Sequence, residues 1–308
     1  MHRKKKSFII SFDGTKLLLR IWDDVKEPMG IVQIFHGMAE HSGRYNSFAS
    51  FLNENGFIVY ASDHRGHGYS LHDNNVYGYI GEDGFNNIVK DQRIISDMIR
   101  QRYGSLPLYI FAHSFGSFIG QEYIIGYSND IDGIILSGSA KQSGLDVRAG
   151  SLIASIQNKL LDNTLPAKLI DRLSFGSYNR QVKDRKTEFD WLSKDAKEVD
   201  KYMKDELCGF ISPINFYYHL FRAFKSLYKK DRLKDIAKDL PILIISGDKD
   251  PVGKYGKSTR SLYSQYEKLN LADIELKLYE DARHELLNEI NRQAVYDYIL
   301  QWLEPRSL

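Results

Sequence analysis

Short apolar segments recur along this chain, separated by stretches long enough for helices. Such runs are typical of strands buried on both faces of a sheet, and helical connections favour a parallel order. The predicted strands are 8–11, 17–22, 31–35, 58–62, 108–112, 131–137, 242–246 and 274–279. Asp13 and Gly14 predict a hairpin between the first two, so we expect an antiparallel edge. The periodicity predicts amphipathic helices over 83–103 and 293–303. The sequence thus predicts an α/β fold, with a mostly parallel sheet of about eight strands covered by helices on both faces.

The succession of strands stops between Ser137 and Asp239, a stretch too long for a structureless loop in a compact domain. We therefore predict a core of residues 1–139 and 236–308, interrupted by a helical cap of residues 140–235. Helices are expected near 152–161 and 210–224. Because the cap is inserted between two strands, it should lie over the carboxyl edge of the sheet. Most of its apolar side chains should pack internally, whereas a minority such as Leu145, Phe210 and Tyr217 could face a substrate.

Composition excludes several classes of partner. The 308 residues carry a formal net charge of only +2, which gives no reason to expect nucleic acid. Basic residues 3–6 precede an apolar run too short for a signal sequence, so we expect a solvated, frayed terminus. No run approaches the length of a membrane span. The single Cys208 fits a reducing compartment, and a cytoplasmic location is expected.

Residues 112–116, Ala-His-Ser-Phe-Gly, resemble the sharp strand-to-helix turn that exposes a nucleophilic serine. A serine hydroxyl is a poor nucleophile at neutral pH, so the turn must present it to a base. Ala112 and Gly116 fill the two small positions of the G-x-S-x-G pattern, with one additional methyl group at Ala112. The alternative for Ser114 is a simple cap on the following helix.

An acid and a histidine should follow in that order, each directly after a strand. Asp248 and Asp250 follow the strand at 242–246, and His284 follows the strand at 274–279. We expect Ser114 to attack an acyl carbon, His284 to carry the proton, and Asp250 to fix the imidazole tautomer. Asp248 is the weaker acid candidate, since it can shape the turn through backbone contacts. His113 should be structural.

A tetrahedral intermediate also requires donors for its oxyanion. The backbone N–H of Phe115 lies at the start of a helix, where the dipole favours negative charge. A second donor should come from the loop after the strand at 31–35, and Met38 occupies that place behind the flexible Gly37.

Five segments of this chain resemble the monoacylglycerol lipase and lysophospholipase branch of the α/β-hydrolases. These are 36–45 (HGMAEHSGRY), 63–70 (DHRGHGYS), the turn around Ser114, 247–253 (GDKDPVG) and 282–289 (ARHELLNE). The resemblance spans nearly the whole chain. It implies the α/β-hydrolase fold, a helical cap over an acyl pocket, the triad of Ser114, Asp250 and His284, and Met38 and Phe115 as oxyanion donors.

The resemblance also implies a pocket for the alcohol group. In that branch a Glu and an Arg line it, here Glu40 and Arg44, together with a second histidine whose position is taken by Leu287. An apolar side chain there discriminates less well in favour of a diol. A loop ion pair is the alternative role for Glu40 and Arg44.

The leading functional prediction is hydrolysis of a single-chain lipid ester, lysophospholipid or monoacylglycerol, through an acyl-serine intermediate. Alternatives with the same triad are a short-chain esterase, a peptidase or a thioesterase. A binding protein on an inactive hydrolase scaffold is disfavoured, because both Ser114 and His284 are present. No cofactor and no metal are expected, since the grouping at Asp63, His64 and His67 fits loop stabilisation better. A transient contact of the cap with a membrane surface would suit a lipid substrate, whereas the oligomeric state is not predicted.

Overall fold

A single eight-stranded sheet organises the computed structural model, which describes residues 4–183 and 185–307. The spatial order is β1-β2-β4-β3-β5-β6-β7-β8. The first two contacts, β1 with β2 and β2 with β4, are antiparallel, and the remaining neighbours are parallel. The strands are β1 (Lys4–Ile10), β2 (Lys16–Trp22), β3 (Gly30–Phe35), β4 (Phe57–Ser62), β5 (Leu108–His113), β6 (Gly133–Ser137), β7 (Ile242–Gly247) and β8 (Ile274–Tyr279). The predicted mostly parallel sheet is confirmed.

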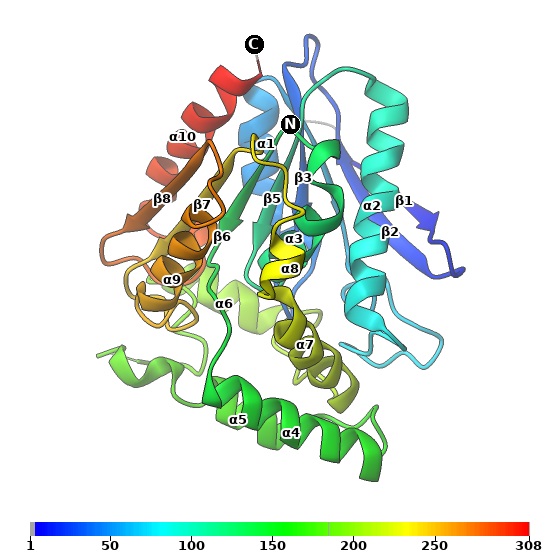
Figure 1. Cartoon of the computed structure of the whole chain (residues 1–308), viewed down its shortest axis with the longest axis vertical. Helices are drawn as coiled ribbons and strands as arrows, with labels where there is room; N and C mark the ends of the chain where they lie inside the picture. The colour runs from blue at the N-terminus through cyan, green and yellow to red at the C-terminus, as the bar shows by residue number, and fades with distance from the viewer. Residues whose placement is uncertain (1–3, 184, 308) are drawn as a thin grey trace.

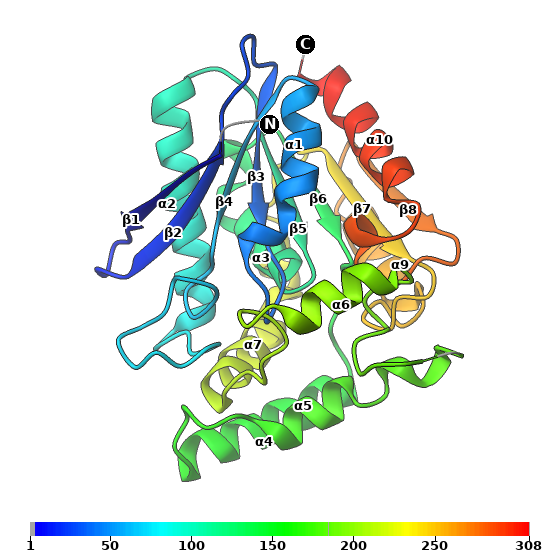
Figure 2. The same ribbon diagram turned by 180° about the vertical axis from the view of Figure 1, so that it is seen from behind.

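Helices cover both faces of this sheet. Figure 1 shows α2 (Gly84–Tyr103), α3 (Phe115–Tyr127) and α9 (Lys257–Glu267) on one face, and Figure 2 shows α1 (Asn46–Glu54) and α10 (Arg292–Leu303) on the other. Short 3₁₀ helices occur at Ser42–Tyr45, Ser128–Asp130, Tyr178–Gln181, Leu286–Asn288 and Glu304–Arg306. The arrangement places the carboxyl ends of the parallel strands at one edge.

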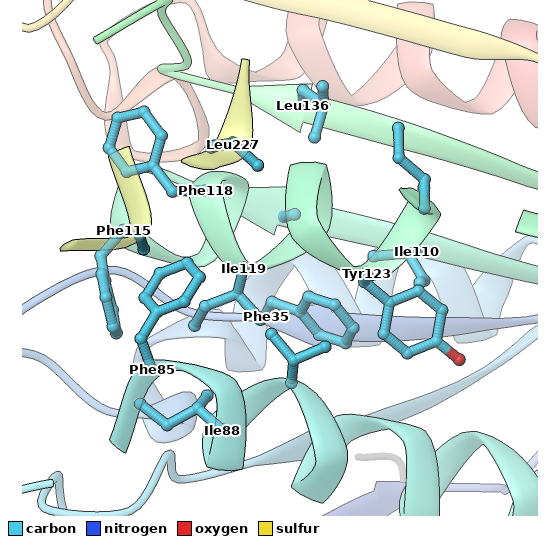
Figure 3. Close-up of a cluster of buried hydrophobic side chains, with 14 of the residues drawn as sticks. Phe35, Phe85, Ile88, Ile110, Phe115, Phe118, Ile119, Tyr123, Leu136 and Leu227 are labelled. Carbon is cyan, nitrogen blue, oxygen red and sulfur yellow. The ribbon is translucent and has the colours of Figure 1, made fainter. Parts of the chain in front are cut away.

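Successive side chains of each strand point to opposite faces of the sheet, and this produces two apolar layers. In β5, Leu108 and Ile110 face the layer beneath α2 and α3, whereas Tyr109 and Phe111 face the layer beneath α1 and α10. Figure 3 shows side chains of α2 and α3 meeting those of β3 and β5, among them Phe35, Phe85 and Ile119. Burial on both faces explains why the strands read as continuous apolar runs.

The first strand corrects one expectation. Residues 4–6 are not a frayed terminus, because β1 pairs with β2 along its whole length, from Lys4 with Trp22 to Ile10 with Lys16. The basic residue before them, Arg3, lies outside the described residues. Within the described part of the chain, no helix is both long and apolar enough to cross a bilayer.

Between β6 and β7 the described residues form five α-helices and the 3₁₀ helix Tyr178–Gln181, in a segment that we call the insertion (residues 138–241). The α-helices are α4 (Leu145–Leu160), α5 (Lys168–Phe175), α6 (Ala196–Lys204), α7 (Ile214–Leu227) and α8 (Lys230–Leu233). The helix expected from residue 210 begins at Ile214, after Pro213 in extended conformation. α4 packs closely on α7: a Cβ added to Gly150 would lie 2.5 Å from a ring carbon of Phe221. The boundaries of the predicted cap stay a prediction.

Large apolar side chains are exposed on the outer surface of the insertion. α4 and α5 lie farthest from the sheet, at the bottom of Figure 1. In these two helices and the segment between them, exposed large apolar side chains recur mostly every four or seven residues, and their exposed fractions range from 47% at Leu165 to 80% at Leu145. We call this set the leucine stripe: Leu145, Leu152, Ile156, Leu160, Leu161, Leu165, Leu169 and Leu173.

Candidate active site

Ser114 occupies a strained turn between β5 and α3. Its φ of 52° and ψ of −118° are unusual for a residue with a side chain, and such conformations cost about 1–3 kcal/mol. Its N–H donates to the carbonyl oxygen of Ser137 at 2.9 Å. A Cβ on Gly116 would lie 2.2 Å from the carbonyl oxygen of Phe35, so only glycine permits this approach. The hydroxyl of Ser114 makes no capping bond to the helix, in contrast to the alternative stated above.

Loops after β5, β7 and β8 bring three predicted side chains together. His284 Nε2 lies 2.8 Å from Ser114 Oγ, and His284 Nδ1 lies 3.0 Å from Asp250 Oδ2. Asp250 is fully buried and accepts two further bonds, from the N–H of Val252 at 2.8 Å and the hydroxyl of Ser246 at 3.1 Å. An ionised Asp250 only accepts, so the proton of a neutral imidazole lies on Nδ1 and leaves Nε2 free to take the serine proton.

Electrostatics favour a charged carboxylate and a basic imidazole. Burial acts to raise the pKa of Asp250, but the charge and hydrogen bond of His284 and the bond from Val252 hold it below its ordinary value. Burial acts to lower the pKa of His284, yet the carboxylates of Asp250, Glu285 and Glu40 raise it above its ordinary value. His284 is therefore a stronger base than free imidazole.

The weaker acid candidate Asp248 and the expected structural residue His113 lie apart from this chain of hydrogen bonds. Asp248 Oδ1 accepts the N–H of Asp281 at 2.8 Å, and its side chain is 32% exposed. It shapes the turn, while Asp250 pairs with the imidazole. His113 is buried with its ring 4.8 Å from that of His284. Burial, followed by the charge of His284, lowers the pKa of His113 to about 4.

The predicted oxyanion donors lie beside the serine. Met38 and Phe115 line the same cavity as Ser114. Among the hydrogen bonds between described residues, none is donated by the backbone N–H of either. Phe115 is the first residue of α3, where the helix dipole favours an anion. Both N–H groups are therefore available to a substrate oxygen.

The cavity above Ser114 has a volume of about 1190 Å³. The insertion supplies most of its apolar wall, including Phe210, Tyr217, Leu220, Phe221 and Phe224. Phe210 and Tyr217 are two of the side chains that the sequence suggested for this role. Leu145, the third, belongs to the leucine stripe and is exposed.

Glu40 and Arg44 form an ion pair that includes a third residue, Glu285. Arg44 Nη1 lies 2.6 Å from Glu40 Oε2, and its two Nη atoms lie 2.7 and 2.8 Å from the carboxylate oxygens of Glu285. Burial acts to raise the pKa of Glu285, but Arg44 holds it at about 2. Sequence reasoning missed Glu285, although a carboxylate directly after the candidate base His284 could have been recognised as a residue close to the site.

The three predicted substrate-binding residues differ in their access to the large cavity. All three line a small void of about 20 Å³. Only Glu40 also lines the large cavity. Leu287 packs in the apolar layer beneath α1 and α10, so its side chain does not reach the space around Ser114.

The motif at residues 63–70 braces the loop that carries Met38. Asp63 is fully buried, pairs with Arg20 and accepts the N–H of Ser42. His64 N–H donates to His36 Nε2 at 2.8 Å, and burial lowers the pKa of His64 to about 3. His36 and His64 are therefore neutral rings whose hydrogen bonds hold this loop in place.

One group of metal-ligating residue types occurs in the described ranges, formed by His41, Asp205 and Cys208. Their ligand atoms lie within 4.8 Å of one another. However, His41 Nδ1 accepts the N–H of Gly43 at 3.1 Å, so a neutral ring carries its proton on Nε2, which faces Asp205 at 2.9 Å. The nitrogen directed at the cluster thus has no free lone pair. The group fits a hydrogen bond between core and insertion better than a metal site.

Comparison with known proteins places the chain among hydrolases. The model of the serine aminopeptidase S33 family matches residues 26–291. A monoacylglycerol lipase of Mycolicibacterium smegmatis is 26% identical over 290 residues, which cover 94% of this chain and 93% of that protein. An uncharacterized abhydrolase domain-containing protein of Dictyostelium discoideum is 26% identical, over 97% of this chain but 29% of that longer protein.

Among solved structures, a highly thermostable carboxyl esterase from Bacillus coagulans, in complex with glycerol, superimposes with a TM-score of 0.91. It is 25% identical, and the match covers 100% of both chains. The family match spans most of this chain. The chain therefore belongs to the serine aminopeptidase S33 family of α/β-hydrolases, in its monoacylglycerol lipase-like branch.

Proposed function

We propose that this protein is a serine carboxylester hydrolase that acts on single-chain lipid esters through an acyl-serine intermediate. The observation that carries the proposal is the chain of hydrogen bonds from Ser114 through His284 to the buried Asp250, at the base of a cavity with an apolar wall. A nucleophile, a base and an orienting acid in this order are the requirements of acyl transfer.

In the proposed reaction, Ser114 Oγ attacks the ester carbon while His284 Nε2 takes its proton. The carbonyl oxygen becomes an oxyanion that the N–H groups of Met38 and Phe115 stabilise. The intermediate collapses, the bond to the leaving alcohol breaks, and His284 returns the proton to that alcohol. Water then attacks the acyl-serine, with the same imidazole accepting its proton, and the carboxylic acid and the free serine are released.

The aromatic and aliphatic wall supplied by the insertion supports an acyl chain as the apolar part of the substrate. The Mycolicibacterium relative named a monoacylglycerol lipase, and the esterase solved with glycerol, support a glycerol-type ester. In this proposal the insertion is the cap predicted from the sequence.

We further propose that the insertion contacts a membrane surface transiently. The leucine stripe exposes apolar side chains along α4, α5 and the segment that joins them. The same two helices carry exposed basic side chains at Arg148, Lys159, Lys168 and Arg172, which complement anionic lipid headgroups. A surface with this composition would bring the cavity close to lipid substrates.

A substrate panel tests the reaction. Purified protein should hydrolyse p-nitrophenyl esters and monoacylglycerols of rising chain length, and should cleave an aminoacyl-naphthylamide poorly. A fluorophosphonate probe should label Ser114, and Ser114→Ala should abolish labelling and lower kcat by on the order of 10⁶. If the protein prefers the amide, the proposal of ester hydrolysis is wrong and peptidase activity, which the family's name suggests, takes its place. Absence of both labelling and turnover would refute acyl transfer.

A further inference from the structure

Two buried carboxylates line the cavity on the same side of Ser114. Glu40 is 3% exposed and Glu285 is 6% exposed. They share one guanidinium, that of Arg44, so the group of three carries a net charge of −1. Tyr45 adds only a neutral hydroxyl, which donates to Glu40 Oε1 at 2.8 Å.

These carboxylates lie close to the reacting groups. The point at which a Cβ on Gly37 would stand is 2.7 Å from Glu40 Oε1 and 3.3 Å from Ser114 Cβ. Glu285 follows His284 directly in the chain, and both carboxylates raise the pKa of that imidazole. Because His284 protonates the departing alcohol, a charge near it acts on the alcohol side of the ester.

Arg44 is not available to balance an incoming anion. Its Nη atoms are bonded to Glu40 and Glu285, and its guanidinium lies 4.7 Å from the ring centroid of Tyr202. It lines the small void rather than the large cavity. The cations that do line the large cavity have exposed side chains, at Arg172, Arg185, Lys186 and Lys254.

We propose that Glu285 makes the alcohol side of the site selective against anionic head groups. The preferred substrates are acyl esters of neutral alcohols such as glycerol, and esters whose alcohol carries a phosphate are disfavoured. This inference rests on the proposed ester hydrolysis. Without Glu285 the remaining pair of Arg44 and Glu40 would be neutral, so removing this carboxylate removes the net charge of the group.

The physical basis is electrostatic repulsion between a substrate phosphate and the carboxylates that line the cavity. Charges near a protein surface interact several-fold more strongly than in bulk solvent. A phosphate within a few ångströms of an unbalanced carboxylate is therefore disfavoured by roughly tenfold or more. A glycerol hydroxyl, in contrast, can donate a hydrogen bond to a carboxylate oxygen.

The test compares two soluble esters with the same octanoyl chain, 1-octanoylglycerol and 1-octanoylglycerol 3-phosphate, below their micellar concentrations. The wild-type kcat/KM should favour the glycerol ester by at least about tenfold. Glu285→Gln should reduce that preference by about tenfold, mainly through faster turnover of the phosphate. Both esters use the same imidazole, so a change in the basicity of His284 cancels in the ratio.

Asp248→Asn is the matched control, because it neutralises a carboxylate of a neighbouring loop that does not line the cavity. Its ratio should equal that of the wild type. An unchanged ratio in folded Glu285→Gln protein, or wild-type preference for the phosphate, would overturn the inference.

A second measurement needs no variant: the wild-type ratio should fall as KCl rises from 0.01 to about 1 M, because salt screens the repulsion. A ratio that does not change with salt would also overturn the inference. Hydrolysis of neither ester, with no fluorophosphonate labelling, would instead refute the proposed function.

Discussion

The sheet core and the insertion distribute polarity in opposite ways. The core buries charge: Arg20 and Asp63 are 2% and 0% exposed, and Asp250 is also fully buried. The insertion exposes hydrocarbon along its outermost helices, in the leucine stripe. Buried charges require exact partners, so they fix the loops that carry the candidate site. Exposed leucines need no specific partner, so the outer surface of the insertion remains free to contact another apolar surface.

The sharpest test of the core is the contrast between its two neighbouring carboxylates. Asp250→Asn should lower kcat by on the order of 10⁴, because the amide favours the wrong imidazole tautomer. Asp248→Asn should change kcat by less than about threefold, since its loop contacts can be replaced by solvent. Steady-state kinetics on a p-nitrophenyl ester measures both, and the reverse ranking would identify Asp248 as the acid.

The pH profile of the same pair adds a signed prediction. His284 must be neutral to accept a proton, so activity is lost as pH falls through its pKa. Since Asp250 contributes to raising that pKa, the residual acid limb of Asp250→Asn should move to lower pH. The limb of Asp248→Asn should coincide with that of the wild type, and a shift of both would assign the effect to general electrostatics.

Breaking an ion pair should lower the free energy of unfolding much more in the sheet core than in the insertion. Asp63→Asn leaves the buried Arg20 without its anion and should lower the free energy of unfolding by about 3–5 kcal/mol. The matched change in the insertion is Asp200→Asn, which removes the exposed pair with Lys204 at 2.7 Å and should cost less than about 0.5 kcal/mol. Urea denaturation measures both, and equal losses would contradict the contrast drawn here.

The smallest effects are expected on the leucine stripe. Replacing Leu152 and Leu160 together by Gln should leave the free energy of unfolding within about 1 kcal/mol of the wild type. Binding to phosphatidylglycerol vesicles should weaken by roughly tenfold, because two apolar side chains no longer enter the lipid. Ile10→Gln, at an exposed position of the edge strand β1, is the control and should not alter binding in a sedimentation assay. Unchanged binding of the double variant would argue against membrane contact.

The sequence was most informative where one physical rule governs a segment. The central strands were predictable because burial on both faces leaves runs without charge, as in β5 and β7, whereas the partly buried β8 was recognisable by its alternation of apolar and polar residues. Ser114, Asp250 and His284 were predictable as candidates because each follows such a strand, although their catalytic role stays a prediction. The edge strand β1 was partly missed, since Lys5 and Lys6 expose charged side chains while their backbone pairs with β2.

Pairings between residues far apart in the chain could not be predicted from the sequence. Arg44 and Glu285 are 241 positions apart, and nothing in either local pattern indicates that the two would meet. The short helix α6 was also missed, although Asp195 is a recognisable start signal whose side chain accepts the N–H of Lys197. In the insertion, amphipathic spacing indicated helices but not which face would be covered, because that depends on the packing of α4 on α7.

One contact between the two regions has a mechanical consequence. The carbonyl oxygen of Ala39 accepts bonds from the hydroxyl of Tyr202 and the N–H of Gly209, each at 3.0 Å. Ala39 adjoins Met38, so an outward movement of segment 202–209 would break both bonds to the loop that carries the proposed oxyanion donor. We therefore expect any opening along this segment to loosen that donor, and its return to restore the two restraints.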